Sequence, residues 1–393
     1  MNSREFGGPS LHGHCTAFDA LMYDEDRQSG RTLDPKIMKI ELYRDLESYH
    51  AWAMEKVLGH CKSLDADALT ATLPLGPGSL LATLKHMAAA EQVWLDRWLL
   101  NPNPSMHDTP NSIVELESMF ASLARDRTTL LESDPNSLSK SISYRNMKGE
   151  PDEQKLGDLV LHVLNHGIHH RAQALHFLKR QGKSFPGGID YIFYRIARPT
   201  IPLRAEVAEG CRQWGLEVGE TAVPYDAPDL ESLAQYCDYG DWAMRKLFDQ
   251  CRDLTNDPLD QDWGMGVGSI RKSLLHIYDA ESFWQANWHT TGSPFPKTPT
   301  TTSIAELSKL WLEMSEKKLE YLYRSGQDQL GRSVTVDVGG GPMEYHLSES
   351  LLQLSVHGTL HRAQVTNMPR SSGKAPDAID FVVWLRQTHG VSA

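Results

Sequence analysis

Two histidines four residues apart indicate where this chain could bind a metal ion. His166 and His170 would lie on one face of a helix, because side chains at positions i and i+4 lie one above the other. A third imidazole from another helix would complete a three-nitrogen site with one open coordination position. His86 is the expected third ligand. The second half of the chain holds a corresponding set, His276, His357 and His361.

The ordinary alternative for a histidine on an apolar face is a core residue satisfied by hydrogen bonds. Comparison of the two halves favours a metal site, because these histidines recur together and the neighbouring histidines do not. His162 corresponds to Gln353, and His169 corresponds to Leu360. We therefore expect a divalent metal in each half. Three imidazoles suit zinc, nickel or iron, and copper as well, and the ligand types do not choose among these metals.

The chain repeats itself at an offset of 190 or 191 residues. The sequence Trp-Ala-Met-Glu-Lys at 52–56 recurs as Trp-Ala-Met-Arg-Lys at 242–246. The run with the histidine pair, 166–173, recurs at 357–364. Self-similarity at a fixed offset is typical of a duplicated unit, so we predict two copies of one domain.

Within each copy the apolar residues follow a helical period. The predicted helices of the first copy are 37–62, 79–100, 111–132 and 156–181, and those of the second are 229–253, 270–289, 303–325 and 346–368. Between the third and fourth helix, short β-branched runs end in glycines and indicate an extended or β-hairpin crossover. The predicted fold class is all-α, with two tandem four-helix bundles related by a pseudo-two-fold axis.

Composition shifts divide the chain into four parts. Residues 1–35 have no counterpart in the second half and are predicted to be a poorly structured extension. The first domain is expected over 36–195 and the second over 229–390. The segment 196–228 is broken by prolines and is predicted to be a linker, with one helical pattern near 206–215.

Charge and cysteine usage exclude several classes of protein. The chain has 39 basic and 51 acidic residues, a net charge of −12, which argues against nucleic-acid or anionic-membrane partners. Five cysteines without a CxxC motif are typical of reduced thiols in the cytoplasm. We expect a cytoplasmic protein with a small-molecule substrate, in which the two halves form an intramolecular pseudo-dimer and the chain is monomeric.

Two motifs resemble a known family. The first is His-x4-Glu-x2-Trp from His86, and the second is His-x3-His-Arg-Ala-Gln from His166. Both recur in the second half, and with the four-helix pattern they resemble the DinB/YfiT-like superfamily over 37–194 and 229–388. The resemblance implies up-down-down-up four-helix bundles that hold a divalent metal with three histidines.

The metal ligands that this resemblance implies are the histidines already singled out: His86, His166 and His170, then His276, His357 and His361. Many members have glycine before the final glutamine of the motif, where this chain has Ala172 and Ala363. That change leaves the ligands intact.

Two glutamates interrupt otherwise apolar helical stripes. Glu91 and Glu281 need partners, because burying a lone carboxylate is costly. They are candidate catalytic residues, either as acceptors for a ligand histidine or as general bases. The alternative is a structural ion pair with Arg171 or Arg362.

Three neutral imidazoles would leave the metal its full charge, which lowers the pKa of a bound water or favours a bound thiolate. The resemblance implies metal-dependent hydrolases and S-transferases that use a low-molecular-weight thiol as cofactor. The sequence has no serine nucleophile elbow, GxGxxG or phosphate-binding loop. The expected function is a metal-dependent enzyme acting by thiol transfer or hydrolysis on a small molecule. A non-catalytic metal-binding or stress-response protein and a structural pseudo-dimer remain as alternatives.

Overall fold

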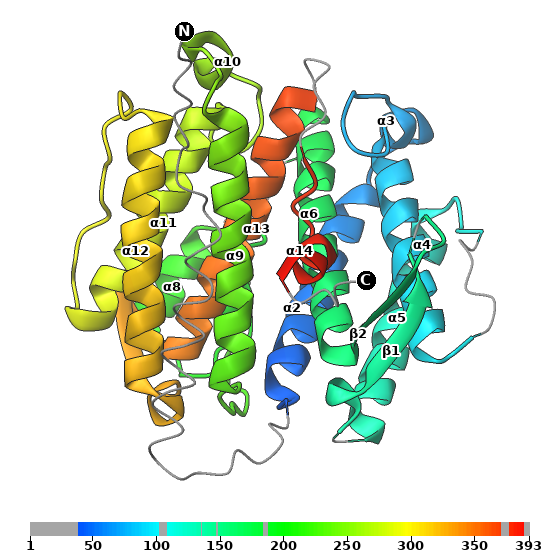
Figure 1. Cartoon of the computed structure of the whole chain (residues 1–393), viewed down its shortest axis with the longest axis horizontal. Coiled ribbons are helices and arrows are strands. Elements are labelled where there is room, and N and C mark those ends of the chain that lie inside the picture. Colours follow the sequence, from blue (N-terminus) through cyan, green and yellow to red (C-terminus); the bar gives the residue numbers. More distant parts are fainter. Residues whose placement is uncertain are drawn as a thin grey trace, which may run out of the picture. The chain divides into compact units, whose positions relative to one another are not determined.

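Four long helices form the frame of each half of the chain (Figure 1). In the first half they are α2 (Glu41–Cys61), α4 (Leu80–Trp98), α5 (Ile113–Ser133) and α6 (Leu156–Arg180). In the second half they are α9 (Leu230–Cys251), α11 (Ile270–His289), α12 (Ile304–Ser325) and α13 (Leu347–Arg370). The computed structural model describes residues 38–101, 108–134, 136–146, 148–183, 188–370 and 377–388. The extension predicted over 1–35 lies outside these described residues.

Side-chain caps explain where most of these helices begin. The Ser79 hydroxyl accepts a hydrogen bond from the backbone N–H of Ala82, and Ser112 accepts one from that of Glu115. Three helices of the second half begin with the same type of cap, at Asp229, Ser269 and Ser303. Each cap satisfies one of the N–H groups that a helix start leaves without a partner. The eight predicted helices are confirmed to within a few residues at either end.

Paired side chains give the direction of each helix. Lys85 pairs with Asn111, and Glu91 pairs with Arg127. The residue numbers of the partners rise together, so α4 and α5 run in the same direction. The pairs between α2 and α5 and between α4 and α6 run in opposite senses. The second half repeats these relations. Each half is therefore an up-down-down-up bundle, and the predicted all-α class is confirmed.

A two-stranded antiparallel hairpin precedes the last long helix of each half. In the first half β1 (Ser141–Arg145) pairs with β2 (Pro151–Lys155), and in the second β3 (Ser333–Asp337) pairs with β4 (Pro342–His346). Alternate side chains of β1 and β3 are buried, as a half-buried strand requires. The predicted β-hairpin crossovers are confirmed.

Short helices fill the connections. They are α3 (Ala66–Thr70), η1 (Ser137–Ser139), α7 (Tyr191–Ala197), α8 (Ala205–Gln213), α10 (Asn256–Asp260), η2 (Gln327–Gln329) and α14 (Phe381–Thr388). The helical pattern near 206–215 corresponds to α8, whereas α7 and α14 were not predicted. No helix in the described parts of the chain is long and apolar enough to cross a bilayer.

The two bundles contact each other through α6 and α13, which lie side by side in Figure 1. The contact is reciprocal, because α7 packs on α13 while α14 packs on α6. Equivalent hydrogen bonds within each half hold the segments that precede α7 and α14: the Tyr49 hydroxyl donates to the carbonyl of Ile189, and the Tyr239 hydroxyl donates to that of Ile379, both at 2.9 Å. The reciprocal packing of α7 and α14 is the signature of a pseudo-two-fold pair.

Candidate metal centre

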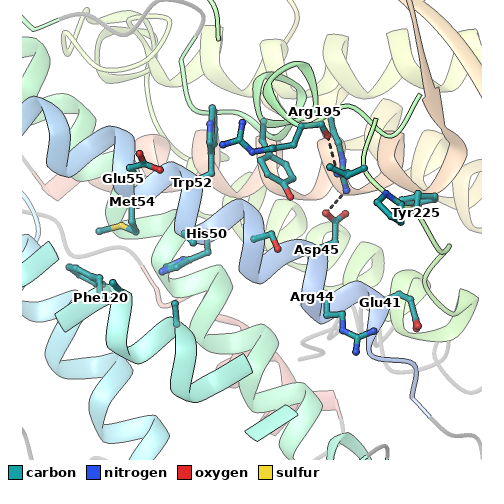
Figure 2. A pocket seen from close by; sticks show the side chains of 18 of the residues that line it. Glu41, Arg44, Asp45, His50, Trp52, Met54, Glu55, Phe120, Arg195 and Tyr225 are labelled. Carbon is teal, nitrogen blue, oxygen red and sulfur yellow. Dashed lines mark hydrogen bonds and ion pairs between the residues drawn. The ribbon is translucent and has the colours of Figure 1, made fainter. Parts of the chain in front are cut away.

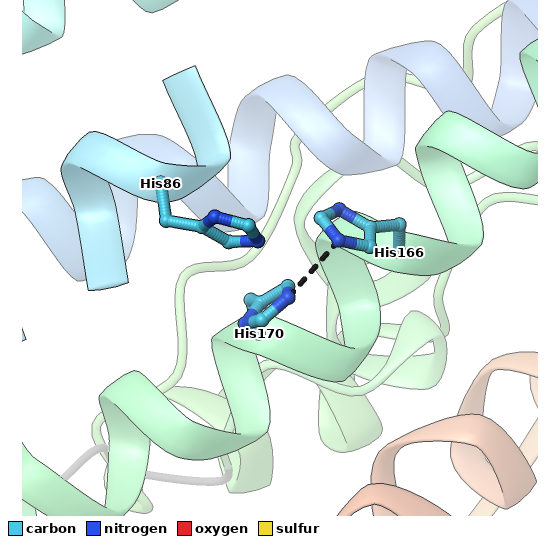
Figure 3. Close-up of side chains that lie close together, drawn as sticks. All are labelled: His86, His166 and His170. Carbon is cyan, nitrogen blue, oxygen red and sulfur yellow. Dashed lines mark hydrogen bonds between the residues drawn. The ribbon is translucent and has the colours of Figure 1, made fainter. Parts of the chain in front are cut away.

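Three imidazoles of the first bundle converge on one point (Figure 3). His86 comes from α4, and His166 and His170 come from successive turns of α6. One ring nitrogen from each residue lies within 4.8 Å of the other two. Nε2 of His166 and Nε2 of His170 are 3.0 Å apart. The helical spacing of four residues thus gives the geometry that it predicts.

The amide of Gln173, one turn after His170, orients its ring. Nδ1 of His170 lies 2.8 Å from the Gln173 Oε1. Since an amide oxygen only accepts hydrogen bonds, Nδ1 carries the proton and Nε2 is left with a lone pair. Gly76, with φ +50°, lies against this amide, and a Cβ there would approach Oε1 to 2.2 Å. The turn before α4 therefore needs glycine at this position.

The second bundle repeats the arrangement with His276 of α11 and with His357 and His361 of α13. Nδ1 of His361 lies 2.8 Å from Oε1 of Gln364. Nδ1 of His357 lies 2.8 Å from a carboxylate oxygen of Asp190, a residue of the first half. Nε2 of His357 is buried and has no hydrogen-bond partner. Both rings on α13 therefore present Nε2 without a proton.

Burial favours the neutral form of four of the triad histidines by lowering their pKa. It lowers the pKa of His276 to about 4, and the neighbouring His357 lowers it further. It also holds the pKa of His166 and of His361 well below the usual value and lowers that of His86. A neutral imidazole is the form that donates a lone pair to a metal.

These features fit a divalent ion. Two nitrogens bound to one tetrahedral zinc ion would lie about 3.3 Å apart, close to the 3.0 Å between His166 and His170. The two nitrogens are close enough to share one proton in a hydrogen bond, and a divalent ion bound to both lone pairs would take the place of that proton. A divalent ion would also give the orphaned Nε2 of His357 a partner. The residues of both triads could hold a metal, and each triad supplies three nitrogen donors.

Glu91 lies in a buried charge network beside the first triad. Its carboxylate accepts hydrogen bonds from Arg127 at 2.6 Å and from His50 at 3.1 Å. Arg127 also binds Glu47, and Arg171 donates to the other nitrogen of His50. Burial alone would raise the pKa of Glu91, but Arg127 and His50 lower it to about 2. The ion-pair partner of Glu91 is thus Arg127 of α5, and not Arg171 as the alternative interpretation expected.

Glu281 has a simpler partner in the second bundle. It accepts a hydrogen bond from Nζ of Lys318 at 2.6 Å, and Lys318 also binds Asp241. The expected partner Arg362 instead donates to Thr359. The catalytic roles considered for Glu91 and Glu281 stay predictions, and the structure places each carboxylate on a buried cation.

A cavity of about 920 Å³ lies elsewhere in the first half, between α2, α5 and the connection 198–228 (Figure 2). Its wall includes Asp45, Trp52 and Arg195, and none of the histidines of either triad. One charged group of the wall, Arg195, is fully engaged: it pairs with Asp45, as the dashed lines show, and with Glu349 at 2.7 Å. The cavity is therefore separate from both histidine triads.

Several residues that support the triads were not predicted to have functional roles. Gln173 and Gln364 end the histidine motif at the same spacing in both halves, so the repeat itself is the signal that could have found them. Asp190 lies in the segment 189–191, which recurs at 379–381. Asp190 contacts His357 of the other copy, and a sequence pattern within one copy does not reveal a contact between copies.

Comparison with known proteins agrees with the duplicated fold. The model of the DinB family matches residues 38–202 and again 229–389, one match for each bundle and its triad. Protein DinB of Bacillus subtilis (strain 168) is 24% identical over 160 residues, which are 38% of this chain and 92% of that protein. No solved structure matches the chain. Since the two matches together cover most of the chain, it belongs to the DinB family, with two copies of the family's domain in tandem.

Proposed function

We propose that the chain is a metal-dependent enzyme whose two triads, His86, His166 and His170 with His276, His357 and His361, each bind a divalent ion. The observation that carries the proposal is the convergence of three histidine side chains in each bundle, with one ring nitrogen of each within 4.8 Å of the other two. Zinc, nickel and iron all suit such donors. A divalent ion held by three neutral ligands keeps its charge and lowers the pKa of a water or thiol bound to it.

The donor count favours catalysis over a purely structural ion. A structural zinc site has four protein ligands, whereas each group of candidate ligands among the described residues contains three histidines. His86, His166 and His276 are only partly buried, so a small molecule could reach the open side. We propose thiol transfer or hydrolysis of a small molecule, with a low-molecular-weight thiol as the candidate cofactor.

In this proposal neither Glu91 nor Glu281 transfers a proton. With a pKa of about 2, Glu91 is a weak base near neutral pH. Glu281 is held by Lys318. Both carboxylates instead tie helices together behind the triads. We further propose a monomeric chain in the cytoplasm, where the buried free thiols Cys61, Cys211, Cys237 and Cys251 would stay reduced.

Metal analysis tests the proposal. Protein purified without chelators should hold close to two divalent ions per chain, and the single variants His166→Ala and His357→Ala should each hold close to one. A metal content near zero that added zinc or nickel does not restore would refute the metal centres.

A cobalt-substituted sample tests the open position. A low-molecular-weight thiol should produce a sulfur-to-cobalt charge-transfer band, which the double variant His166→Ala, His357→Ala lacks. Bound cobalt whose spectrum does not respond to millimolar thiol, or to pH between 6 and 9, would favour the non-catalytic metal-binding alternative.

A further inference from the structure

A carboxylate of the first half reaches into the triad of the second half. Oδ2 of Asp190 lies 2.8 Å from Nδ1 of His357, and both side chains are largely buried. Because a carboxylate accepts the Nδ1 proton, the lone pair of His357 is confined to Nε2, on the side where His276 and His361 converge. A ligand histidine that donates its second N–H to a carboxylate is held in orientation and made more basic.

The surroundings of Asp190 indicate that this carboxylate requires a cation in the triad. Its other oxygen, Oδ1, is buried without a hydrogen-bond partner. Among the ion pairs of the described residues, Asp190 takes part in one, and its partner is His357. One hydrogen bond from an imidazole leaves a buried carboxylate only partly compensated, whereas a divalent ion bound by His357 would place positive charge beside Asp190.

The position of Asp190 is fixed by the contact between the bundles. Asp190 precedes α7, which packs on α13. The preceding carbonyl, that of Ile189, accepts a hydrogen bond from Tyr49 of α2. The carboxylate is therefore presented by the frame of the first bundle, and the second bundle alone does not contain it.

The repeat places Asp380 in the corresponding position of the second half. Tyr239 binds the carbonyl of Ile379, as Tyr49 binds that of Ile189, and α14 packs on α6. Burial lowers the pKa of His86, and the negative charge of Asp380 opposes this shift. A second contact crosses the interface there, since the amide nitrogen of Gln173 lies 3.2 Å from the side-chain oxygen of Asn367.

We propose that Asp190 is a positioning residue for the metal centre of the second bundle, that Asp380 serves the first bundle in the same way, and that each centre is thus completed by the opposite half of the chain. This inference rests on the proposed metal binding and goes beyond it. It explains why the two domains are held together in one reciprocal contact.

The test measures zinc affinity one site at a time, by competition with a chromophoric chelator. In the His166→Ala background only the second triad binds. There, Asp190→Ala should weaken zinc binding about ten- to a hundredfold. Asp380→Ala, the matched control, should leave that affinity unchanged. In the His357→Ala background the two aspartate variants should exchange roles.

A second variant separates orientation from folding. Asp190→Asn keeps an oxygen that can accept from Nδ1 of His357 but removes the charge, and it should restore part of the affinity lost in Asp190→Ala. A folding defect would instead weaken both sites together and lower the unfolding temperature of the metal-free protein. If zinc binds and Asp190→Ala changes its affinity less than twofold, or if both aspartates affect both sites equally, the inference is wrong. If the unsubstituted chain binds no zinc, the proposed function itself fails.

Discussion

At the scale of single residues, one amide decides which nitrogen of His361 faces the centre of the second triad. Gln364 accepts the Nδ1 proton of His361, which leaves Nε2 with its lone pair. The amide lies against Gly266, whose φ is +49°. A Cβ at this glycine would lie 2.0 Å from the Gln364 Oε1. The turn before α11 thus supports the centre without contributing a ligand.

We predict that Gly266→Ala weakens zinc binding at the second triad, because the new methyl group displaces the Gln364 amide. Loss of such a supporting contact typically costs about ten- to a hundredfold in affinity. Gly264→Ala is the matched control, since its φ is also positive, +69°, but a Cβ there meets nothing within 4 Å. Both variants should lose about 1–2 kcal/mol of stability from backbone strain. Chelator competition in the His166→Ala background compares them, and equal zinc affinities would contradict the prediction.

At the scale of elements, a buried cation joins three helices in each bundle. In the first, the guanidinium of Arg127 binds Glu47 and Glu91 through several N–H groups. In the second, the single ammonium of Lys318 serves two carboxylates, those of Asp241 and Glu281. Arginine presents five donors in a fixed plane and lysine a compact charge, so the second network satisfies its acids less fully. One oxygen of Asp241 is buried without a partner.

The second network should make stability depend on pH. Burial raises the pKa of Asp241 to about 6, although Lys318 opposes this shift. The folded state therefore binds this proton more tightly than the unfolded state, whose carboxyl titrates near 4. The resulting stabilisation is present below about pH 4 and is lost as the pH rises through 6, up to about 3 kcal/mol. Glu91 acts in the opposite direction, because its pKa is lowered to about 2, and its contribution is lost as the pH falls below about 4.

The measurement is urea unfolding of the natural protein and of Asp241→Asn between pH 4 and 7. The amide cannot titrate, so the difference in unfolding free energy between the two proteins should change by about 1–3 kcal/mol over this range. The variant should gain relative to the natural protein as the pH rises. A difference that stays constant with pH would show that Asp241 is already ionised throughout.

At the scale of the whole molecule, the sequence predicts what lies within one copy better than what lies between copies. The faces of α4 and α6 follow from helical period, so the spacing identifies His166 and His170, and the recurrence of His86 as His276 identifies the third histidine. The contact of Asp190 with His357 depends on how the copies pack, which periodicity does not contain. The repeat of 189–191 at 379–381 was visible, but it gave no indication of what the aspartate touches.

The partners of the buried glutamates show a second limit. Arg127 and Lys318 occupy corresponding places on α5 and α12, at an offset of 191 residues, yet their residue types differ. The arginine that does recur beside the histidine pair, Arg171, therefore looked like the partner of Glu91. In the structure Arg171 instead donates a hydrogen bond to His50. The packing of α5 against α4 determines that Glu91 pairs with Arg127. The sequence of α4 alone does not reveal this partner.

The contact between the bundles should keep the halves together without the chain that connects them. Asn165 of α6 is a buried link across it, because it donates to the Tyr239 hydroxyl at 2.8 Å and accepts from Thr359 at 3.0 Å. Buried polar groups of this kind are costly to separate, and they lie among the apolar side chains of α6 and α13. Residues 220–222 of the connection are exposed, so a protease site inserted there can be cut in the folded protein. We predict that the two fragments still elute together in size-exclusion chromatography and keep both metal ions. Elution as two separate halves would show that the connection, and not the α6–α13 contact, holds the pair together.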